Sequence, residues 1–313
     1  MNAVKLFALG LISGALVALS LAYFYPSTAD LGIDNPHWNG LSVLVRYYGV
    51  KVVSSLSCEA TDPLTSALLI VGPQKPFERG EVEAIRDFVR EGGLLIVADD
   101  FGTGNQLLRE MGLEVRLGGG LLLDPLRKYK DRALPKVRAG NLTLVLNYAT
   151  VIEGGGFKAL AYSSPYSFLD LNLNLKYDPG EPKGPFPVVA EIPYGLGKVV
   201  VISDASPFIN SMLTLGDNRE FLSELVGGRR AILDSSHWRA SAISLFKRFL
   251  KTLRDSLRVP EVKYTLLGGA LLSLYFLNLR VKRRKINELE EVSKKHPEWD
   301  RRILEEIIND VQR

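Results

Sequence analysis

The chain has 313 residues, of which 46% are hydrophobic and 24% charged, and its formal net charge is +4. Residues 25–262 carry equal numbers of basic and acidic side chains, so the excess of cations belongs to the two ends and indicates no nucleic-acid-binding surface. The single cysteine, Cys58, excludes a disulfide within the chain and lies far from any Cys or His cluster with zinc-ligand spacing.

An uncharged apolar stretch occupies residues 6–24 and is long enough to cross a bilayer as a helix. Lys5 precedes it within a short segment, residues 1–5, and no Lys or Arg follows until Arg46. This asymmetry predicts a cytoplasmic N-terminus and an extracytoplasmic domain after the span. A signal peptide cleaved after Ala22 is the alternative.

Small residues recur at every fourth position of this stretch, a pattern that lets membrane helices approach closely. It favours pairing of two copies of the chain as a homo-oligomer, or pairing of this span with a second apolar segment. The residues are Gly10, Gly14, Ala18 and Ala22.

Residues 25–240 alternate strand-like and helix-like stretches, the pattern of an α/β domain. The continuous apolar run LLIVG at 68–72 predicts a buried parallel strand, and FERGEVEAIRDFVREGG at 77–93 has helical spacing. In chain order we expect helices at 39–49, 77–93 and 105–111, and strands at 50–55, 68–72, 94–100 and 113–117.

The pattern loosens between residues 118 and 190, where glycines and prolines interrupt it. We interpret this segment as an inserted, partly antiparallel lobe, with strands near 142–147 and 158–162. The α/β pattern then resumes, which predicts a flavodoxin-like or Rossmann-like, mostly parallel sheet. Its last elements are strands at 186–192, 197–204 and 229–234 and a helix that begins at Asp217.

Three segments follow the outer domain. Residues 241–259 form an amphipathic helix whose basic face is either solvated or rests on the membrane surface. Residues 263–280 are a second, shorter apolar span, and parity with the first places residues 281–313 in the cytoplasm. A helix from Pro297 in this tail either docks on a protein partner or lies on lipid headgroups.

Three strand-like runs end in acids, and the ligands of open α/β sheets bind beyond the carboxyl ends of the strands. If the strands are neighbours, these acids meet at one rim, which would bind a ligand, a divalent cation or a substrate carbonyl. The alternative is that each Asp caps the helix that follows. The candidate residues are Asp99, Asp100, Asn105, Asp204, Asn210, Asp234 and His237.

The glycine-rich run FGTGN at 101–105 resembles a phosphate-binding loop only loosely, because it has neither the dinucleotide fingerprint nor the P-loop spacing. We therefore expect no cofactor.

Three runs, at 68–108, 197–210 and 217–234, resemble a prokaryotic, notably archaeal, family catalogued as a domain of unknown function. The resemblance covers about residues 30–237. It implies membrane anchoring, a domain similar to class I glutamine amidotransferases and a flavodoxin-like sandwich. Members of the family are often encoded beside MoxR-type AAA ATPases, which implies a role in a membrane-associated assembly.

One departure from true amidotransferases bears on activity. Those enzymes carry a nucleophilic cysteine on the sharp turn after a central strand. The matching turn here is Ala98-Asp99-Asp100-Phe101, which contains neither Cys nor Ser, and Cys58 precedes the 68–72 strand. A cysteine-based amidase is therefore not expected.

These observations favour a non-catalytic, two-pass membrane protein with an extracytoplasmic domain that binds a ligand or partner and a cytoplasmic tail that relays or scaffolds. Partners are expected to be the lipid bilayer and proteins contacted by the domain and tail, with no nucleic acid. Two alternatives stay open: a metal-assisted hydrolase that uses the strand-end carboxylates, and an accessory subunit of a transport or secretion complex.

Overall fold

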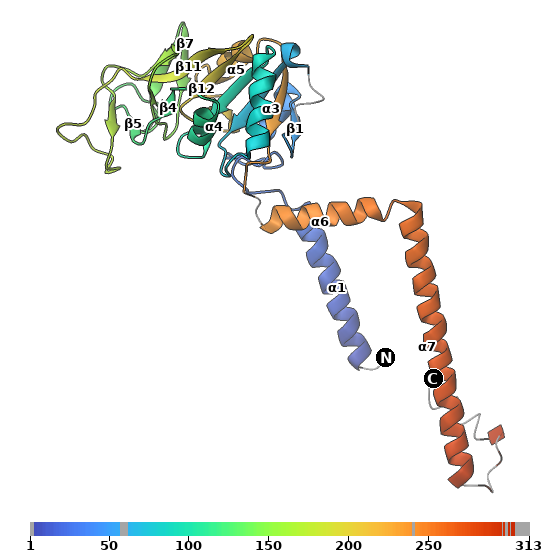
Figure 1. The fold of residues 1–313 in the computed structure, drawn as a ribbon. Coiled ribbons are helices and arrows are strands. Elements are labelled where there is room, and N and C mark those ends of the chain that lie inside the picture. Colours follow the sequence, from blue (N-terminus) through green and yellow to red (C-terminus); the bar gives the residue numbers. More distant parts are fainter. Residues whose placement is uncertain are drawn as a thin grey trace. The chain divides into compact units, whose positions relative to one another are not determined.

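A computed structural model describes residues 3–56, 62–239, 242–295, 297, 300 and 302–303 (Figure 1). The chain divides into two compact units, residues 1–245 and 246–313, each of which is described by itself. Cys58 and nearly all of the helix expected after Pro297 lie outside the described residues.

The first unit contains a nine-stranded sheet in the order β1-β13-β2-β3-β12-β11-β9-β6-β7. The first five strands of this order are parallel to one another. They are β1 (Lys51–Val53), β13 (Arg230–Asp234), β2 (Ser66–Val71), β3 (Leu94–Ala98) and β12 (Gly197–Ile202). The remaining four continue the sheet antiparallel: β11 (Pro187–Tyr194), β9 (Lys158–Tyr162), β6 (Lys136–Ala139) and β7 (Leu142–Val145).

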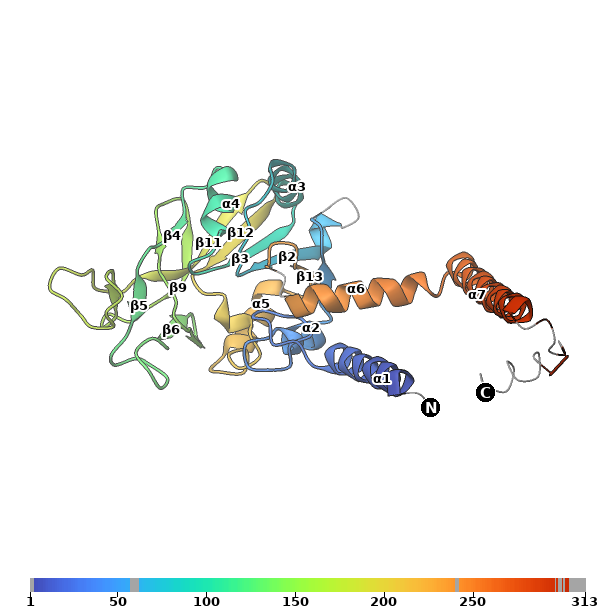
Figure 2. The same ribbon diagram turned by 90° about the horizontal axis from the view of Figure 1, so that it is seen from below.

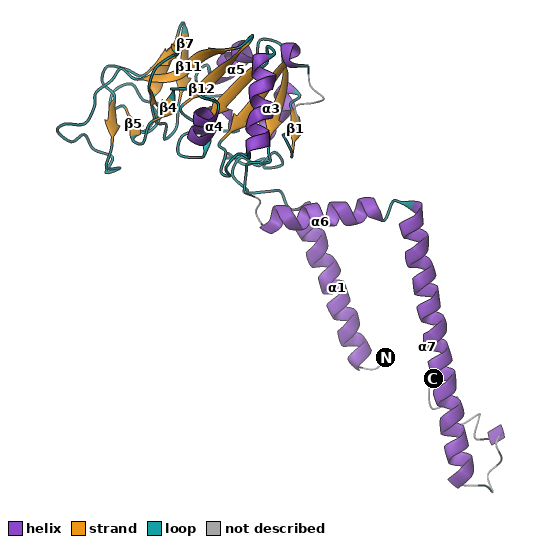
Figure 3. Ribbon diagram, in the orientation of Figure 1, coloured by secondary structure: helices purple, strands orange, loops and turns teal. Residues whose placement is uncertain are grey.

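Helices cover both faces of the parallel half, as Figures 2 and 3 show. On one face lie α3 (Arg79–Arg90) and α4 (Gly104–Glu110), and on the other lie α2 (Ser42–Tyr48) and α5 (Asn218–Val226). Successive strand residues point to opposite faces. Leu69 therefore packs with α2 and α5, whereas Ile70 packs with α3 and α4. The continuous apolar strands thus reflect burial on both sides, as in other parallel sheets.

The segment expected as an inserted lobe is in part an extension of the main sheet, because β6, β7 and β9 lie within it. The strand at 187–194 is antiparallel to β12 because only Gly195 and Leu196 separate the two, and a parallel pair needs a crossover of a dozen or more residues. Two small sheets complete the segment. They pair β4 (Arg116–Leu117) with β8 (Ile152–Glu153), and β5 (Leu121–Leu123) with β10 (Phe168–Asp170).

The expected strand at 113–117 is therefore shortened and lies outside the main sheet. Asn105 of α4 explains this, because its side chain accepts a hydrogen bond from the Leu117 N–H at 2.8 Å and donates one to the Leu117 carbonyl at 2.9 Å. These bonds hold the segment beside α4.

Three further helices are α1 (Ala3–Phe24), α6 (Ala242–Ser256) and α7 (Pro260–Lys295). Within the part of the chain that the structure describes, one helix stretch, Pro260–Arg280, is long and apolar enough to span a membrane, and Gly10–Leu21 is a shorter apolar helix. Two membrane spans were expected, so the structure supports one of them by length and composition. Helix α7 also continues past residue 280, through the basic cluster, to Lys295.

Candidate functional site

A pocket of about 420 Å³ opens at the carboxyl ends of the parallel strands. Its floor lies between β3 and β12, which are neighbours in the sheet. The chain leaves β3 for α4 on one face, whereas it leaves β12 for Phe208 and α5 on the other. This divergence is a topological switch point, the place where open α/β sheets bind ligands.

Asp99 begins the loop after β3 and lies at one wall of the pocket, with 1% of its surface exposed. Its carboxylate accepts hydrogen bonds from the N–H groups of Asp100 (3.0 Å), Gly102 (3.1 Å) and Gly104 (2.7 Å). The N–H groups of the Gly-Thr-Gly turn therefore bind the Asp99 carboxylate. A phosphate bound by this turn would need the same N–H groups. A Cβ at Gly102 would lie 2.5 Å from Asp99 Oδ1 and 2.3 Å from the Pro73 carbonyl, which explains the glycine.

The pocket acids lie in an environment that favours their neutral forms. Burial raises the pKa of Asp99 to about 6, against the opposing effect of its backbone hydrogen bonds. Burial also raises the pKa of Asp100. Asp204, at the end of β12, is fully buried, and burial raises its pKa to about 7.

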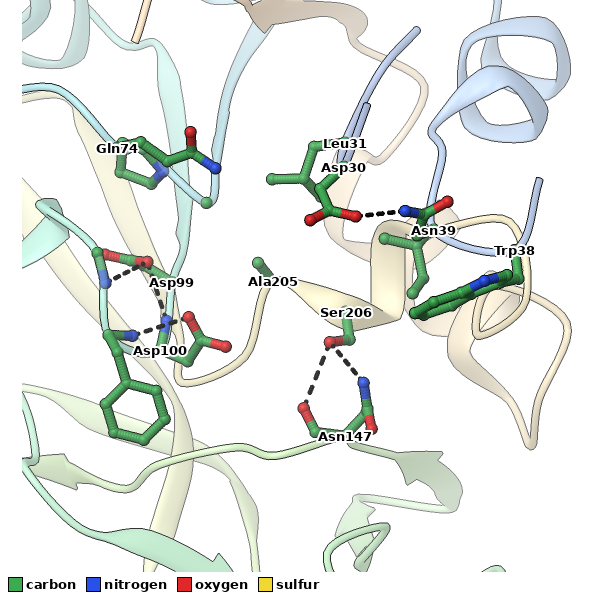
Figure 4. Close-up of a pocket in the computed structure, with 15 residues that line it drawn as sticks. Asp30, Leu31, Trp38, Asn39, Gln74, Asp99, Asp100, Asn147, Ala205 and Ser206 are labelled. Carbon is green, nitrogen blue, oxygen red and sulfur yellow. Dashed lines mark hydrogen bonds between the residues drawn. The ribbon is translucent and has the colours of Figure 1, made fainter. Parts of the chain in front are cut away.

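Asp204 lies beneath the pocket and supports it. Its carboxylate accepts hydrogen bonds from the N–H groups of Asn147 (2.6 Å) and Ser206 (2.7 Å). The Asn147 side chain in turn donates to Ser206 Oγ at 3.1 Å, and both residues line the pocket (Figure 4). Asp204 therefore fixes the loop before β8 against the loop after β12.

The wall opposite Asp99 comes from the loop that follows α1. Asp30, Leu31, Trp38 and Asn39 lie across the opening from the two strand-end acids in Figure 4. Asn39 Nδ2 donates a hydrogen bond to Asp30 Oδ1, and Trp38 is 66% exposed. The sequence indicated none of these residues, because nothing in their spacing shows that this loop folds back over the ends of the strands.

Two expected site residues have structural partners away from the pocket. Asn105 joins α4 to Leu117, as described above. Asn210 Nδ2 donates to the carbonyls of Asn35 (3.0 Å) and His37 (2.7 Å), and its Oδ1 accepts from the Val43 N–H at 2.8 Å. Asn210 therefore holds the pocket-lining loop against the loop after β12 but does not itself line the cavity.

Asp234 and His237 form a second buried cluster at the same edge of the sheet, outside the pocket. His237 Nδ1 lies 2.6 Å from Asp234 Oδ2, and Nε2 lies 3.2 Å from Glu81 Oε2 on α3. The imidazole stacks on Phe77, with 3.8 Å between ring centroids. Burial lowers the pKa of His237, but the two carboxylates outweigh this and raise it above its usual value.

The side chains that line the pocket supply carboxylates, amides, a hydroxyl and aromatic rings. None of the described residues that line it is Lys, Arg, His or Cys. No group of three or more His, Cys, Asp or Glu side chains among the described residues is placed to hold a metal ion. Of the seven expected residues, the pocket therefore brings together Asp99 and Asp100, with Asp204 behind it.

The model of a family described as a domain of unknown function (DUF4350) matches residues 33–226. No curated protein matches the chain.

Solved structures that resemble the chain include the mmIFT52 N-terminal domain, with a TM-score of 0.43 and 15% identity over 55% of this chain and 81% of that one. A cytoplasmic protein from Salmonella typhimurium LT2 has a TM-score of 0.35 and 14% identity over 61% of this chain and 86% of that one. A β-galactosidase from Bacillus circulans sp. alkalophilus has a TM-score of 0.30 and 15% identity over 53% of this chain, which covers only 23% of the enzyme.

Proposed function

Because this chain belongs to the family described as a domain of unknown function (DUF4350), its role has to be argued from its own residues, and we propose that it is a non-catalytic, membrane-anchored binding protein. Its outer domain takes a ligand in the pocket between the ends of β3 and β12. The observation that carries this proposal is a pocket at the switch point of the sheet whose polar groups are held in place by backbone hydrogen bonds.

The absence of catalysis is supported by the turn after β3. An amidotransferase-like domain would need its nucleophile there, and this chain has Asp99, whose carboxylate is already engaged by three N–H groups. Ser206 is the hydroxyl in the pocket lining, and its Oγ is paired with Asn147. A serine nucleophile needs an adjacent base, and no described lining residue is a histidine or lysine.

The lining also indicates the class of ligand. Asp30 and Asp100 line the pocket, and no described lining residue is Lys or Arg, so an anionic ligand is disfavoured. Trp38 and Phe101 are 66% and 55% exposed at the opening. Aromatic faces beside carboxylates attract organic cations. The ligand class is therefore an amine or a quaternary ammonium compound.

Residues in or beside the pocket are close in sequence to the segments that connect the outer domain to α1 and to α6. The wall formed by residues 30–39 follows α1 after a few residues. On the other side, Trp238 Nε1 donates to the Val71 carbonyl at 2.7 Å and the Arg239 N–H to Gln74 Oε1 at 3.1 Å, shortly before α6 begins. Gln74 itself lines the pocket. A ligand that orders these loops would therefore act on both connections, which is how a signal would reach the tail.

Membrane attachment by α1 and by the Pro260–Arg280 part of α7, with both termini in the cytoplasm, completes the proposal. Work with an AAA ATPase system remains the partnership implied by the family resemblance. Topology is tested by introducing a cysteine at Leu64 or Lys294 in a Cys58→Ser background. A membrane-impermeant maleimide should label the first in intact cells and the second only after lysis; the reverse pattern would refute the topology.

Binding is tested on the full-length protein in lipid nanodiscs by titration calorimetry with choline, spermidine and, as a neutral comparison, glucose. We expect binding of at least one cation that weakens as salt increases. Asp100→Asn and Trp38→Ala should each weaken binding by about tenfold, because each removes roughly one charge-assisted or cation–π contact. Glu224→Gln, an exposed change on α5, is the matched control. No heat with either cation, or equal binding by the Asp100 variant, would refute the proposed pocket chemistry.

A further inference from the structure

Helix α6 (Ala242–Ser256) carries an apolar stripe that takes no part in the pocket. Because a helix turns by about 100° per residue, side chains three, four and seven positions apart lie on the same side of it. Phe246, Phe249, Leu253 and Leu257 have this spacing and are 36%, 61%, 45% and 42% exposed. A row of large exposed apolar side chains is a surface that fits an apolar partner.

The opposite side of the same helix is basic. The spacing of Lys247, Lys251, Arg254 and Arg258 places them away from the apolar stripe. Asp255 is the one acid between residues 245 and 258, and its carboxylate lies 2.9 Å from Arg254. Cations therefore outnumber acids on this side, which complements the phosphates of anionic lipids. A helix with one apolar and one cationic face fits the boundary between lipid tails and headgroups.

The chain breaks its helical path just before the apolar part of α7. Val259 precedes Pro260, and the residue before a proline is disfavoured in helical conformation, so α6 ends before this pair. Proline suits the first position of a helix, where α7 begins. Residues 257–259 alone separate the two helices, and even fully extended they allow only about 14 Å between Ser256 and Pro260. The end of α6 therefore stays close to the start of α7.

The start of α7 is also where the membrane boundary is expected. The apolar stretch begins at Pro260, and Tyr264, one turn further on, is 69% exposed. Tyrosine is enriched at the interfaces of membranes, and the neighbouring Lys263 can extend its amine to the headgroups. The polar layer on each side of the bilayer core is about 5–8 Å thick. A linker of three residues therefore keeps the end of α6 within or beside this layer.

These two observations identify the bilayer as the occupant of the apolar stripe. If α6 continued α7 as one straight helix, its stripe would point into water beyond the span. The break at residues 257–259 instead allows α6 to lie along the surface, where one face meets lipid tails and the other meets phosphates. A fully solvated helix would leave Phe249 and Leu253 in water without any gain from their common alignment.

We propose that α6 is an interfacial helix, which lies in the headgroup layer of the bilayer that α7 spans. Its apolar stripe faces the acyl chains, and its lysines and arginines face the lipid phosphates. The inference rests on the membrane attachment by α7 proposed above, and it depends neither on the ligand of the pocket nor on the side of the membrane. The outer domain would thus be held at its C-terminal connection by a surface contact as well as by the span.

The test measures the depth of single nitroxide labels on the full-length protein in liposomes that contain phosphatidylglycerol. In a Cys58→Ser background, one cysteine is introduced on the stripe, at Phe249 or Leu253, or on the opposite face, at Lys251 or Asp255. Oxygen concentrates among lipid tails and a nickel chelate stays in water, so the ratio of their collision rates with the label reports depth. Two positions on each face are used so that one label that disturbs the helix does not decide the result.

Two reference positions calibrate the ratio. A label at Leu271, within the apolar stretch of α7, should report lipid, and one at Leu196, 83% exposed in the turn before β12, should report water. The oxygen-to-nickel ratio at Phe249 and Leu253 should exceed that at Lys251 by about tenfold, as for a helix half immersed in the interface. Replacement of phosphatidylglycerol by phosphatidylcholine should lower the ratio at Phe249 and leave Leu271 unchanged, because the lipid phosphates then carry no net charge for the basic face.

Three results would overturn the proposal, and they are distinguishable. Water-like ratios at Phe249 and Leu253, with Leu271 still in lipid, would show a solvated helix. Exclusion of both oxygen and nickel from Phe249 and Leu253 would show that protein covers the stripe, from a partner or a second copy. A water-like ratio at Leu271 would refute the span itself, and with it the membrane attachment on which both proposals rest.

Discussion

Replacement of His237 by alanine should destabilise the outer domain in a manner that depends on pH. The imidazole, 4% exposed, lies between the carboxylates of Asp234 (1% exposed) and Glu81 (24% exposed), at 2.6 and 3.2 Å. Both ring nitrogens face an acceptor, so the protonated form satisfies both bonds and the neutral form only one. The pKa of His237 is accordingly raised above its usual 6.5.

The sign of the effect follows from linkage. A histidine whose pKa is higher in the folded than in the unfolded chain stabilises the fold fully below pH 6.5, and this contribution is lost as the pH rises through the folded-state pKa. Below pH 6.5 His237→Ala leaves Asp234 buried without its partner, which costs about 3–5 kcal/mol. As the pH rises through the folded-state pKa the parent loses the ion-pair contribution, so the substitution should cost less at pH 9 and its cost should fall toward about 1–3 kcal/mol from lost packing and hydrogen bonding.

The assay is urea unfolding of the full-length protein at pH 5.5 and pH 9, followed by tryptophan emission. Trp238 is a suitable reporter because its indole is bonded to the Val71 carbonyl next to this cluster. Phe77→Leu removes the stacking partner without removing a charge and is the matched control, expected to cost the same at both pH values. A His237→Ala cost that is equal at the two pH values would show that the histidine is neutral in the fold and refute the reasoning.

Two further predictions concern the pocket. Gly102→Ala should lower the free energy of unfolding by about 1–3 kcal/mol, because its Cβ would lie 2.3 Å from the Pro73 carbonyl. Gly119→Ala has open space around its Cβ and should cost less than about 1 kcal/mol. Equal melting temperatures for the two variants would contradict the packing argument. Burial raises the pKa of Asp204 to about 7. The free energy of unfolding should therefore fall by up to about 1.4 kcal/mol per pH unit as the pH rises from 5 to 7. Asp204→Asn should remove this dependence on pH, which unfolding titrations measure. A parent and variant with parallel pH profiles would be inconsistent with a raised pKa.

Local pattern predicted most elements of the outer domain. The apolar runs at 68–72 and 94–100 became β2 and β3, and the periodic segment at 77–93 became α3. These predictions succeeded because burial on one face or both imposes a period on the residues of each element. The direction in which the strands pair was less predictable. The strand at 187–194 resembles the parallel strands in composition, and only the two-residue turn that begins at Gly195 makes it antiparallel to β12.

The candidate site divides in the same way. Asp99, Asp204 and Asp234 could be assigned to strand ends from the sequence, since each directly follows an apolar run. Which of them faces a cavity depended on the loop at 30–39, because nothing local in that loop specifies that it packs over the strands.

The sequence by itself determined the apolar and basic ends of the chain and the α/β alternation, because each of these is a property of neighbouring residues. The tertiary structure decided that the Gly-Thr-Gly turn surrounds Asp99, that Asp204 supports the pocket from below and that His237 joins β13 to α3. Those contacts join residues that are distant in the chain or depend on the exact path of a turn, and they form only when burial brings the segments together.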